Sequence, residues 1–400
     1  MTAPPAPPAA TPPAAPPGRP LVRFGALSFA YFAAIGLFNP YAPLWFQSLG
    51  FSTLLIGTLA SLQSWTRVVA PYAWSWWGDH SGRRVELIRL AAFGALLAAL
   101  GLFGVRAAVP VALVVALLFL ANSGVVPLYE ALLSQHLNTA TGIDPARYGR
   151  VRMWGSVGFI VSVTGFGALL EAAGIGVFPW FVAAMNALLL AAALRLPATR
   201  SGAVHDEPAP PVLPLLRRPA VAWFFASTFF TVLAHVSLYA FFSLYLVSLG
   251  YGKAAVGAFW AISVVAEIGF FWFQGRFFHW LSPVGWLKLV AAVTTLRFAA
   301  VAAGGSVPAV LGLAQAAHAI TFAGHHAACI ALVHRHFPDR LRGRGQALYT
   351  TLGYGLSGVI GGVGGGLLIE RLSYAAVFWA AALCGVLAWG CAQRAAANTA

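Results

Sequence analysis

The chain has 400 residues, of which 60% are hydrophobic and 8% are charged. Soluble globular proteins are typically about 25% charged, so the composition excludes that class and predicts a multi-pass membrane protein. A net charge of +14 would be compatible with nucleic-acid binding. The basic residues lie in alternate loops, however, and the positive-inside rule for membrane proteins explains this distribution. We therefore expect a surrounding lipid bilayer and no nucleic-acid partner. The three cysteines form no metal-binding motif, and we expect neither metal nor cofactor.

The first 20 residues contain nine prolines, which predicts a disordered tail over residues 1–21. This tail lacks the basic start and apolar centre of a signal peptide, so the first apolar segment is expected to remain as an anchor. Twelve apolar segments follow, most of them near the roughly 20 residues that cross a bilayer. They lie at about 24–47, 54–77, 86–106, 110–134, 151–171, 176–195, 221–247, 255–277, 285–303, 307–332, 346–368 and 374–393.

One long connection, residues 197–219, contains six prolines and five charged residues and is expected to be a cytoplasmic linker. The predicted fold is all-α and integral to the membrane, with twelve transmembrane helices in two pseudo-symmetric six-helix bundles, residues 22–196 and 220–400. Of the 24 Lys and Arg residues, 19 fall on one side of these segments and three on the other. The positive-inside rule then places both termini in the cytoplasm. We expect the inner membrane of a bacterium.

The two halves show a weak internal repeat. Arg67 precedes Asp79 by twelve residues and Glu267 precedes His279 by twelve, which places Arg67 and Glu267 at equivalent depths. Parallel six-span repeats with a site at their interface are typical of secondary transporters.

Glu267 is the only ionisable side chain in the apolar stretch 259–275. A carboxylate within a bilayer costs roughly 2.5–3.5 kcal/mol and needs a bundle interior, a partner or a proton. It is either a neutral residue satisfied by a neighbouring helix or, as we favour, a proton or substrate site. His235, Arg297 and His318 also fall near the middle of their segments. Arg297 needs an acid, Glu267 is the only acid at that depth, and a histidine exchanges protons near neutral pH.

The loop after the second segment reads Ser75-Trp-Trp-Gly-Asp79-His80-Ser-Gly82-Arg83-Arg84. It resembles the loop signature of the major facilitator superfamily, apart from Ser75 and His80. An acid at a helix end can pair with basic groups or cap a neighbouring helix. The resemblance implies a gating loop, whereas the alternative is a solvated cytoplasmic loop. The residues concerned are Asp79, Gly82, Arg83 and Arg84.

The stretch Tyr148-Gly-Arg-Val-Arg152-Met-Trp-Gly-Ser156 narrows this resemblance. It is similar to the sugar/proton symporters and still more to their 3-phenylpropionic acid transporter relatives. Glu130, His235, Glu267, Arg297 and His318 fit the same pattern. The resemblance implies substrate binding by Glu130 and Arg152, and substrate–proton coupling by Glu267, Arg297 and His318. Thr321 is a departure, because the lactose permease type carries a second carboxylate there.

Several assignments stay open from the residues alone. Arg152 can instead snorkel to the membrane interface, and Arg67 is either a substrate ligand or a structural partner of Glu130. We place Arg67 and His235 with the substrate-binding residues. Some aromatic residues are expected to line a cavity, but the sequence does not select among Phe38, Tyr41, Trp65, Tyr239, Phe242 and Trp260.

The sequence thus predicts a monomeric proton symporter for a small organic solute, driven by the proton gradient and working by alternating access. The segments and their edges contain three arginines (Arg67, Arg152 and Arg297) and two acids (Glu130 and Glu267), which leaves an excess of positive charge. This excess favours an anionic substrate such as 3-phenylpropionate, with Arg152 as a ligand. A sugar or nucleoside symporter of the same fold is the alternative. We do not expect an enzyme, because the segments show no catalytic pair or triad, nor a sensor, which normally needs an output domain.

Overall fold

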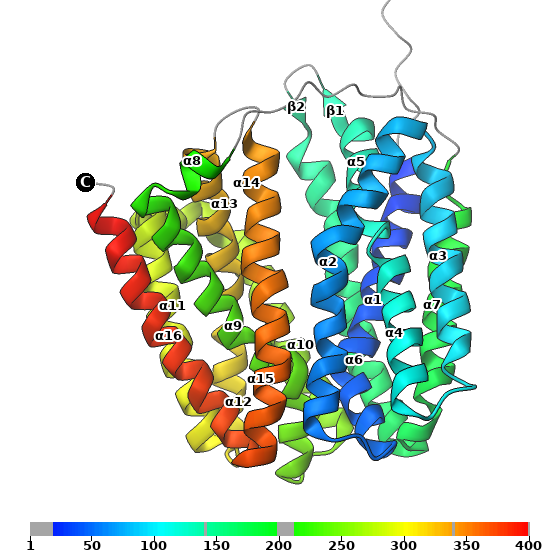
Figure 1. The fold of residues 1–400 in the computed structure, drawn as a ribbon. Helices are drawn as coiled ribbons and strands as arrows, with labels where there is room; N and C mark the ends of the chain where they lie inside the picture. The colour runs from blue at the N-terminus through cyan, green and yellow to red at the C-terminus, as the bar shows by residue number, and fades with distance from the viewer. Residues whose placement is uncertain (1–18, 140–141, 198–211, 338–340, 399–400) are drawn as a thin grey trace, which may run out of the picture.

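The computed structural model describes residues 19–139, 142–197, 212–337 and 341–398. Helices build two groups that stand side by side (Figure 1), and we call residues 19–197 the first half and residues 212–398 the second half. The first half contains α1 (Arg19–Ser48), α2 (Thr53–Ser81), α3 (Arg84–Gly101), α4 (Ala108–Asn122), α5 (Val125–Leu137), α6 (Pro145–Ala173), η1 (Ile175–Val177) and α7 (Phe178–Leu194). Two short strands, β1 (Asn138–Thr139) and β2 (Gly142–Ile143), pair antiparallel between α5 and α6.

The second half is also helical. It contains α8 (Leu213–Leu216), α9 (Pro219–Ser248), α10 (Lys253–Phe277), η2 (Phe278–Trp280), α11 (Pro283–Gly304), α12 (Pro308–Ala316), η3 (Ala319–Gly324), α13 (His325–His336), α14 (Arg342–Leu348), η5 (Tyr349–Leu356), α15 (Ser357–Arg371) and α16 (Tyr374–Ala397). The segments η3 and η5 are π-helical, each inside a longer helical run. The predicted tail over 1–18 and most of the predicted linker, 198–211, lie outside the described residues.

Within the described ranges, ten helical stretches are long and apolar enough to cross a membrane. They match ten of the twelve predicted segments, because neighbouring short helices join into one stretch, as α12, η3 and α13 do over Pro308–His336. The other two segments are α2 and α3, which stand among the helices of the first half (Figure 1). The helix α2 is rich in Ser, Thr and Trp, and the 18 residues of α3 include three charged ones. The helical multi-pass membrane fold is therefore confirmed, while the number twelve and the bundle boundaries stay predictions.

The helices α1 and α9 end in the same way. Gly50 and Gly250 follow the repeated dipeptide Ser-Leu and have φ angles of 80° and 89°, a left-handed conformation that glycine adopts without a clash. In each turn, the N–H of the next residue returns to the carbonyl five residues back, at 3.3 and 3.0 Å. This shared helix ending supports the internal repeat between the halves.

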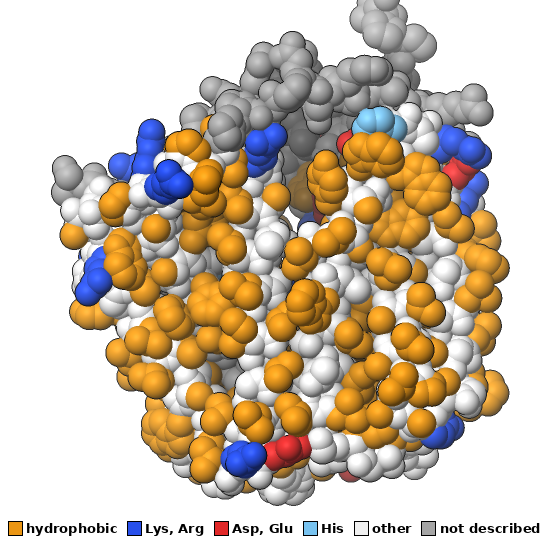
Figure 2. Space-filling model, viewed as in Figure 1, with side chains coloured by type: hydrophobic (Ala, Val, Ile, Leu, Met, Phe, Trp, Pro, Cys, Tyr) orange, Lys and Arg blue, Asp and Glu red, His pale blue; other side chains and the backbone are white. Residues whose placement is uncertain are grey.

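The buried hydrophobic side chains form three clusters. One cluster takes side chains from both halves, including Tyr41 and Phe378. The other two clusters each belong to one half, around Leu132 and around Leu332. We call the end where α2 stops and α3 begins the basic end, because it carries most of the Lys and Arg side chains visible in Figure 2, and the opposite end the far end. The shared cluster joins the halves toward the far end.

Polar contacts between the halves at the far end are also repeated. The Glu171 carboxylate near the end of α6 accepts a hydrogen bond from the backbone N–H of Lys253 at the start of α10. The Glu370 carboxylate near the end of α15 accepts one from the N–H of Leu54 at the start of α2, at 3.0 Å. Each acid therefore caps a helix of the other half, where the helix dipole favours negative charge.

Candidate functional site

A cavity of about 560 Å³ lies between the halves. The molecular surface is hollowed between them toward the basic end (Figure 2). Aromatic side chains make up much of the wall: Phe32, Phe38, Phe46, Phe119, Phe159, Tyr239, Trp260, Phe322, Tyr349 and Tyr354. A wall of this kind suits an apolar ring, which can stack or meet other rings edge to face.

The structure selects among the aromatic candidates. Phe38, Tyr239 and Trp260 line the cavity, and the Tyr239 and Trp260 rings stack with centroids 6.0 Å apart. Tyr41 and Phe242 instead belong to the shared hydrophobic core.

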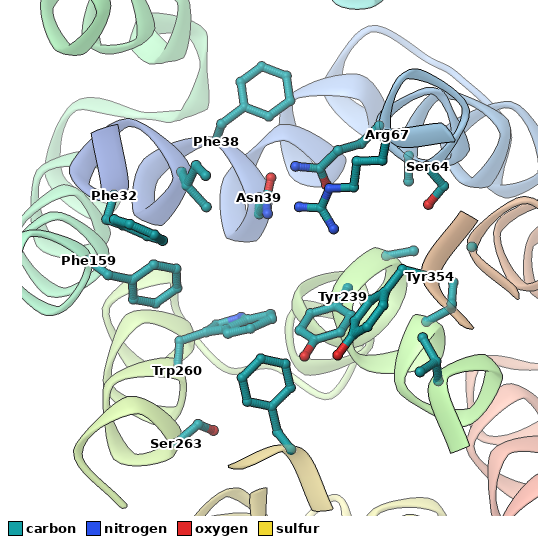
Figure 3. A pocket seen from close by; sticks show the side chains of 18 of the residues that line it. Phe32, Phe38, Asn39, Ser64, Arg67, Phe159, Tyr239, Trp260, Ser263 and Tyr354 are labelled. Atoms are coloured by element: carbon teal, nitrogen blue, oxygen red, sulfur yellow. The ribbon is translucent and has the colours of Figure 1, made fainter. Parts of the chain in front are cut away.

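Arg67 points into the cavity from α2, toward Asn39 (Figure 3). Its side chain is exposed and makes no hydrogen bond or ion pair with the residues that the structure describes. Glu130 instead contacts the Tyr148 hydroxyl at 2.8 Å and the Arg152 Nε at 3.9 Å. The geometry thus does not favour a structural pair of Arg67 with Glu130, and it leaves the Arg67 charge open to the cavity.

Arg152 has partners of its own. Besides its contact with Glu130, its guanidinium lies over the Phe32 ring, 4.3 Å from the centroid. Arg152 lines the cavity from α6, whereas Glu130 is not among the lining residues. Glu130 and Arg152, which the family resemblance assigns together to substrate binding, are therefore neighbours, but only Arg152 reaches the cavity wall.

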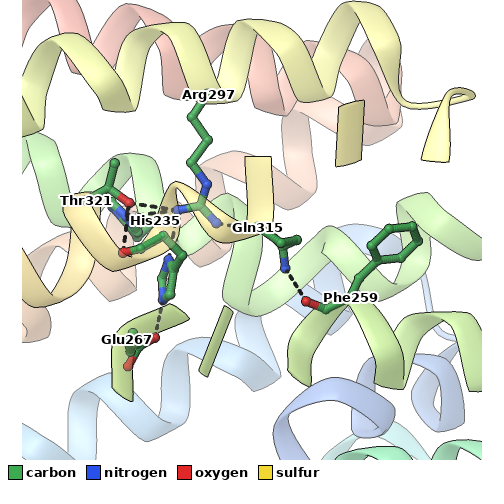
Figure 4. Close-up of polar contacts among 7 residues, drawn as sticks. His235, Phe259, Glu267, Arg297, Gln315 and Thr321 are labelled. Carbon is green, nitrogen blue, oxygen red and sulfur yellow. Dashed lines mark hydrogen bonds and ion pairs between the residues drawn. The ribbon is translucent and has the colours of Figure 1, made fainter. Parts of the chain in front are cut away.

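Glu267 and Arg297 both contact His318, which joins them. Figure 4 draws these contacts as dashed lines. The His318 Nε2 lies 3.1 Å from the Glu267 carboxylate, and its Nδ1 lies 2.8 Å from Nη1 of Arg297. The expected partnership of the acid with the arginine is thus indirect. Glu267 and His318 both line the cavity, whereas Arg297 is buried behind them, 3% exposed.

These contacts fix the protons of His318. A guanidinium only donates hydrogen bonds, so the Nδ1 that faces Arg297 must be the accepting nitrogen. The single proton of the neutral ring then sits on Nε2 and is donated to Glu267. Glu267 accepts this hydrogen bond through a carboxyl oxygen and is the acidic residue in this chain of contacts.

The remaining contacts of Arg297 are neutral. It donates to Thr321 Oγ1 at 2.8 Å and to Gln315 Oε1 at 2.9 Å. Thr321, at the position of the departure from the lactose permease type, is therefore a hydrogen-bonding partner. Gln315 was missed at the sequence level, although an amide within an apolar segment is a signal for such a partner.

His235 lies behind the cavity wall and not on it. Its Nδ1 donates to the Thr231 carbonyl at 2.7 Å, and its Nε2 faces Thr321 Oγ1 at 3.0 Å. It is 3% exposed and is not among the residues that line the cavity. Since a substrate in the cavity does not reach it, the geometry favours support of Thr321 and Arg297 over the substrate contact expected from the sequence.

A second polar group on the wall was not expected. His326 Nδ1 lies 3.3 Å from the Tyr349 hydroxyl, which lies 3.2 Å from the Tyr354 hydroxyl. All three residues line the cavity, and both tyrosines belong to the π-helical segment η5. Such segments are frequent at functional sites.

The predicted gating loop lies at the basic end of the first half. Asp79 pairs with the buried Arg84 at 2.6 Å, and Arg83 pairs with Glu86 on the surface. Gly82 ends α2 with a φ of 64°, as a tight left-handed turn requires. The contacts hold α2 to the start of α3, and the gating role itself stays a prediction.

Comparison with known proteins decides the family. The model of the MFS_1 like family matches residues 21–380. This chain belongs to the MFS_1 like family. The resemblance to the major facilitator superfamily is thereby confirmed, and the family and its relatives are membrane transporters, not enzymes.

Two curated relatives cover almost the whole chain of this MFS transporter. It is 27% identical over 357 residues to the probable 3-phenylpropionic acid transporter of Escherichia coli (strain K12), covering 89% of this chain and 92% of the relative. It is 28% identical over 377 residues to the maltose permease of Geobacillus stearothermophilus, covering 91% of each.

Solved structures share the fold. A mutant of the nucleoside transporter NupG matches with a TM-score of 0.83 and 18% identity, over 94% of this chain and all of that one (100%). The POT family transporter PepTSo matches with a TM-score of 0.78 and 11% identity, over 96% and 99%. At these identities the likeness concerns the fold alone.

Proposed function

We propose that this MFS transporter is a proton-coupled symporter for a small aromatic carboxylate, such as 3-phenylpropionate, and that it works by alternating access. The observation that carries the proposal is Arg67, which has no ion-pair partner among the described residues and lies in a cavity with aromatic walls. The name of the Escherichia coli relative supports the same substrate class.

The charges around the cavity support an anion. Arg152 has Glu130 beside it, and Arg297 reaches Glu267 through His318. Arg67 has no acidic partner among the described residues, so its positive charge remains for the substrate. A guanidinium binds a carboxylate through two parallel hydrogen bonds, and a neutral sugar would leave this charge uncompensated.

Proton coupling follows from Glu267. Its side chain is 17% exposed and lines the cavity, so water there can deliver a proton to it. Protonation removes the negative charge that faces Arg297 through His318 and leaves the site more positive. The proton then favours binding of an anion, and the anion favours binding of the proton, which is the reciprocity that symport needs.

The proposed setting is a bacterial inner membrane, with the basic end and both termini in the cytoplasm and a monomer as the working unit. The positive-inside rule supports this orientation. The cavity is then open to the cytoplasm in this structure, and the capped far end faces outward.

The test is thermal stabilisation of the purified protein by 3-phenylpropionate, cinnamate, maltose, lactose and a nucleoside. We expect a concentration-dependent rise in Tm with the two acids, since a ligand that binds only the folded state stabilises it. Stabilisation by a sugar or the nucleoside, with no response to either acid, would overturn the substrate class in favour of a sugar or nucleoside symporter.

A further inference from the structure

A side pocket of about 50 Å³ adjoins the main cavity within the first half. The two spaces share Arg67, Asn39 and Gln63 as wall residues, whereas Asn122, Ser123 and Asn186 line only the side pocket. Arg67 therefore stands where the pocket meets the cavity, and these three polar residues lie beyond it together with Tyr31 and Thr66. None of these three has a role in the function proposed above.

Two of the hydrogen-bond donors beyond Arg67 already have acceptors. The Ser123 hydroxyl donates to the Leu120 carbonyl at 2.7 Å, and the Asn186 Nδ2 donates to the Val182 carbonyl at 2.8 Å. Two acceptors are not used, because the Oδ1 atoms of Asn122 and Asn186 are buried and have no hydrogen-bond partner in the described part of the chain. Asn186 itself is 2% exposed. A buried oxygen without a partner is costly, so the pocket suits a hydrogen-bond donor.

The size of the pocket limits that donor. A water molecule takes a share of about 30 Å³ of the liquid, so a pocket of about 50 Å³ has room for a hydroxyl group but not for a ring. The two buried oxygens without partners among the described residues favour a neutral hydrogen-bond donor there over an anionic group. The positive charge at the mouth and the acceptors behind it match a carboxylate with a hydroxyl on the neighbouring carbon.

We propose that this side pocket binds the 2-hydroxyl group of an aromatic 2-hydroxy acid. The inference rests on the proposed function, because it takes Arg67 as the ligand of the substrate carboxylate. The hydroxyl hydrogen points to the Oδ1 of Asn122 or Asn186, and the ring occupies the aromatic cavity. The structure thus assigns a preference for 3-phenyllactate over 3-phenylpropionate, two acids that differ only in this hydroxyl.

The experiment measures the Kd of both acids by titration calorimetry on the full-length protein in detergent, using each enantiomer of 3-phenyllactate. A neutral hydrogen bond to a buried acceptor predicts that one enantiomer binds about 3- to 10-fold more tightly than 3-phenylpropionate. Asn186→Leu and Asn122→Leu remove one acceptor each at nearly constant volume. We expect at least one of them to abolish the advantage, and 3-phenylpropionate is the internal control for an intact site.

Equal Kd values for both acids in the wild-type protein would overturn the side-pocket assignment and leave the proposed function standing. An advantage that persists in both variants would also overturn it. Loss of the advantage in either variant supports the assignment, and the wild-type comparison of the two acids decides if one variant does not fold; the two asparagines lie on different helices. Binding of neither acid would overturn the proposed function, and this inference with it.

Discussion

Glu267 meets the buried Arg297 through His318 and not by direct contact. The two His318 nitrogens lie 3.1 Å from the Glu267 carboxylate and 2.8 Å from the Arg297 guanidinium. In the proposed mechanism, the proton that compensates or releases the arginine charge is taken up at the cavity, while the arginine stays buried. This separation would allow a proton from water to alter the charge of the proposed substrate site.

Glu267→Gln should abolish uphill uptake driven by a pH gradient, because the amide cannot gain or lose a proton. Exchange of labelled for unlabelled substrate needs no net protonation and should persist, with little dependence on pH. Both rates can be measured in the same vesicles. Accumulation at the wild-type level in the variant would remove Glu267 from the coupling mechanism.

Arg67→Gln should weaken binding of 3-phenylpropionate by about 10- to 100-fold, as expected for loss of a hydrogen bond to a charged group. Arg152→Gln should weaken it less, because Arg152 already has Glu130 and Phe32 as neighbours. Calorimetry on both variants gives the comparison, and Arg67→Lys, which keeps the charge, should recover part of the affinity. A larger loss of affinity in Arg152→Gln than in Arg67→Gln would make Arg152 the ligand of the substrate carboxylate, which is the assignment that the sequence alone favours.

The fold was largely predictable from the sequence, because the lengths of the apolar segments and the side on which the arginines lie determine a helical multi-pass protein. The sequence did not predict which side chains reach the cavity. His235 and Tyr239 are one turn apart on the same face of α9, yet Tyr239 lines the cavity and His235 lies behind it. His318 contacts both Glu267 and Arg297 from its position directly before the π-helical segment η3. The spacing of residues along the sequence does not reveal where a π-helical segment begins.

The combined change Glu171→Gln and Glu370→Gln should loosen the far end. Each amide loses the negative charge that caps a helix of the other half, a contribution of about 0.3–1 kcal/mol per helix. We expect faster labelling of Ala60→Cys on the cavity wall by an impermeant maleimide added at the far end, in a background without Cys329, Cys384 and Cys391. An equal labelling rate in the protein that keeps Glu171 and Glu370 would show that these helix caps do not hold the far end closed.

Asp79→Asn should lower the transport rate with little change in substrate affinity, since the residue lies in the last turn of α2 at the basic end, away from the cavity lining. It should also lower Tm, because Arg84 is 5% exposed and would lose its carboxylate. Glu86→Gln is the matched control, since its pair with Arg83 is on the surface and contributes little. A large loss of equilibrium binding with normal turnover would contradict the gating role.

The most direct test of proton-coupled carboxylate transport uses purified protein in liposomes that contain a pH-sensitive dye. Addition of 3-phenylpropionate outside should acidify the interior faster than in protein-free liposomes, which report passive entry of the acid. Liposomes with Glu267→Gln or Arg67→Gln should match the protein-free rate. Acidification by the wild-type protein no faster than in protein-free liposomes would contradict the account, as would undiminished acidification by both variants.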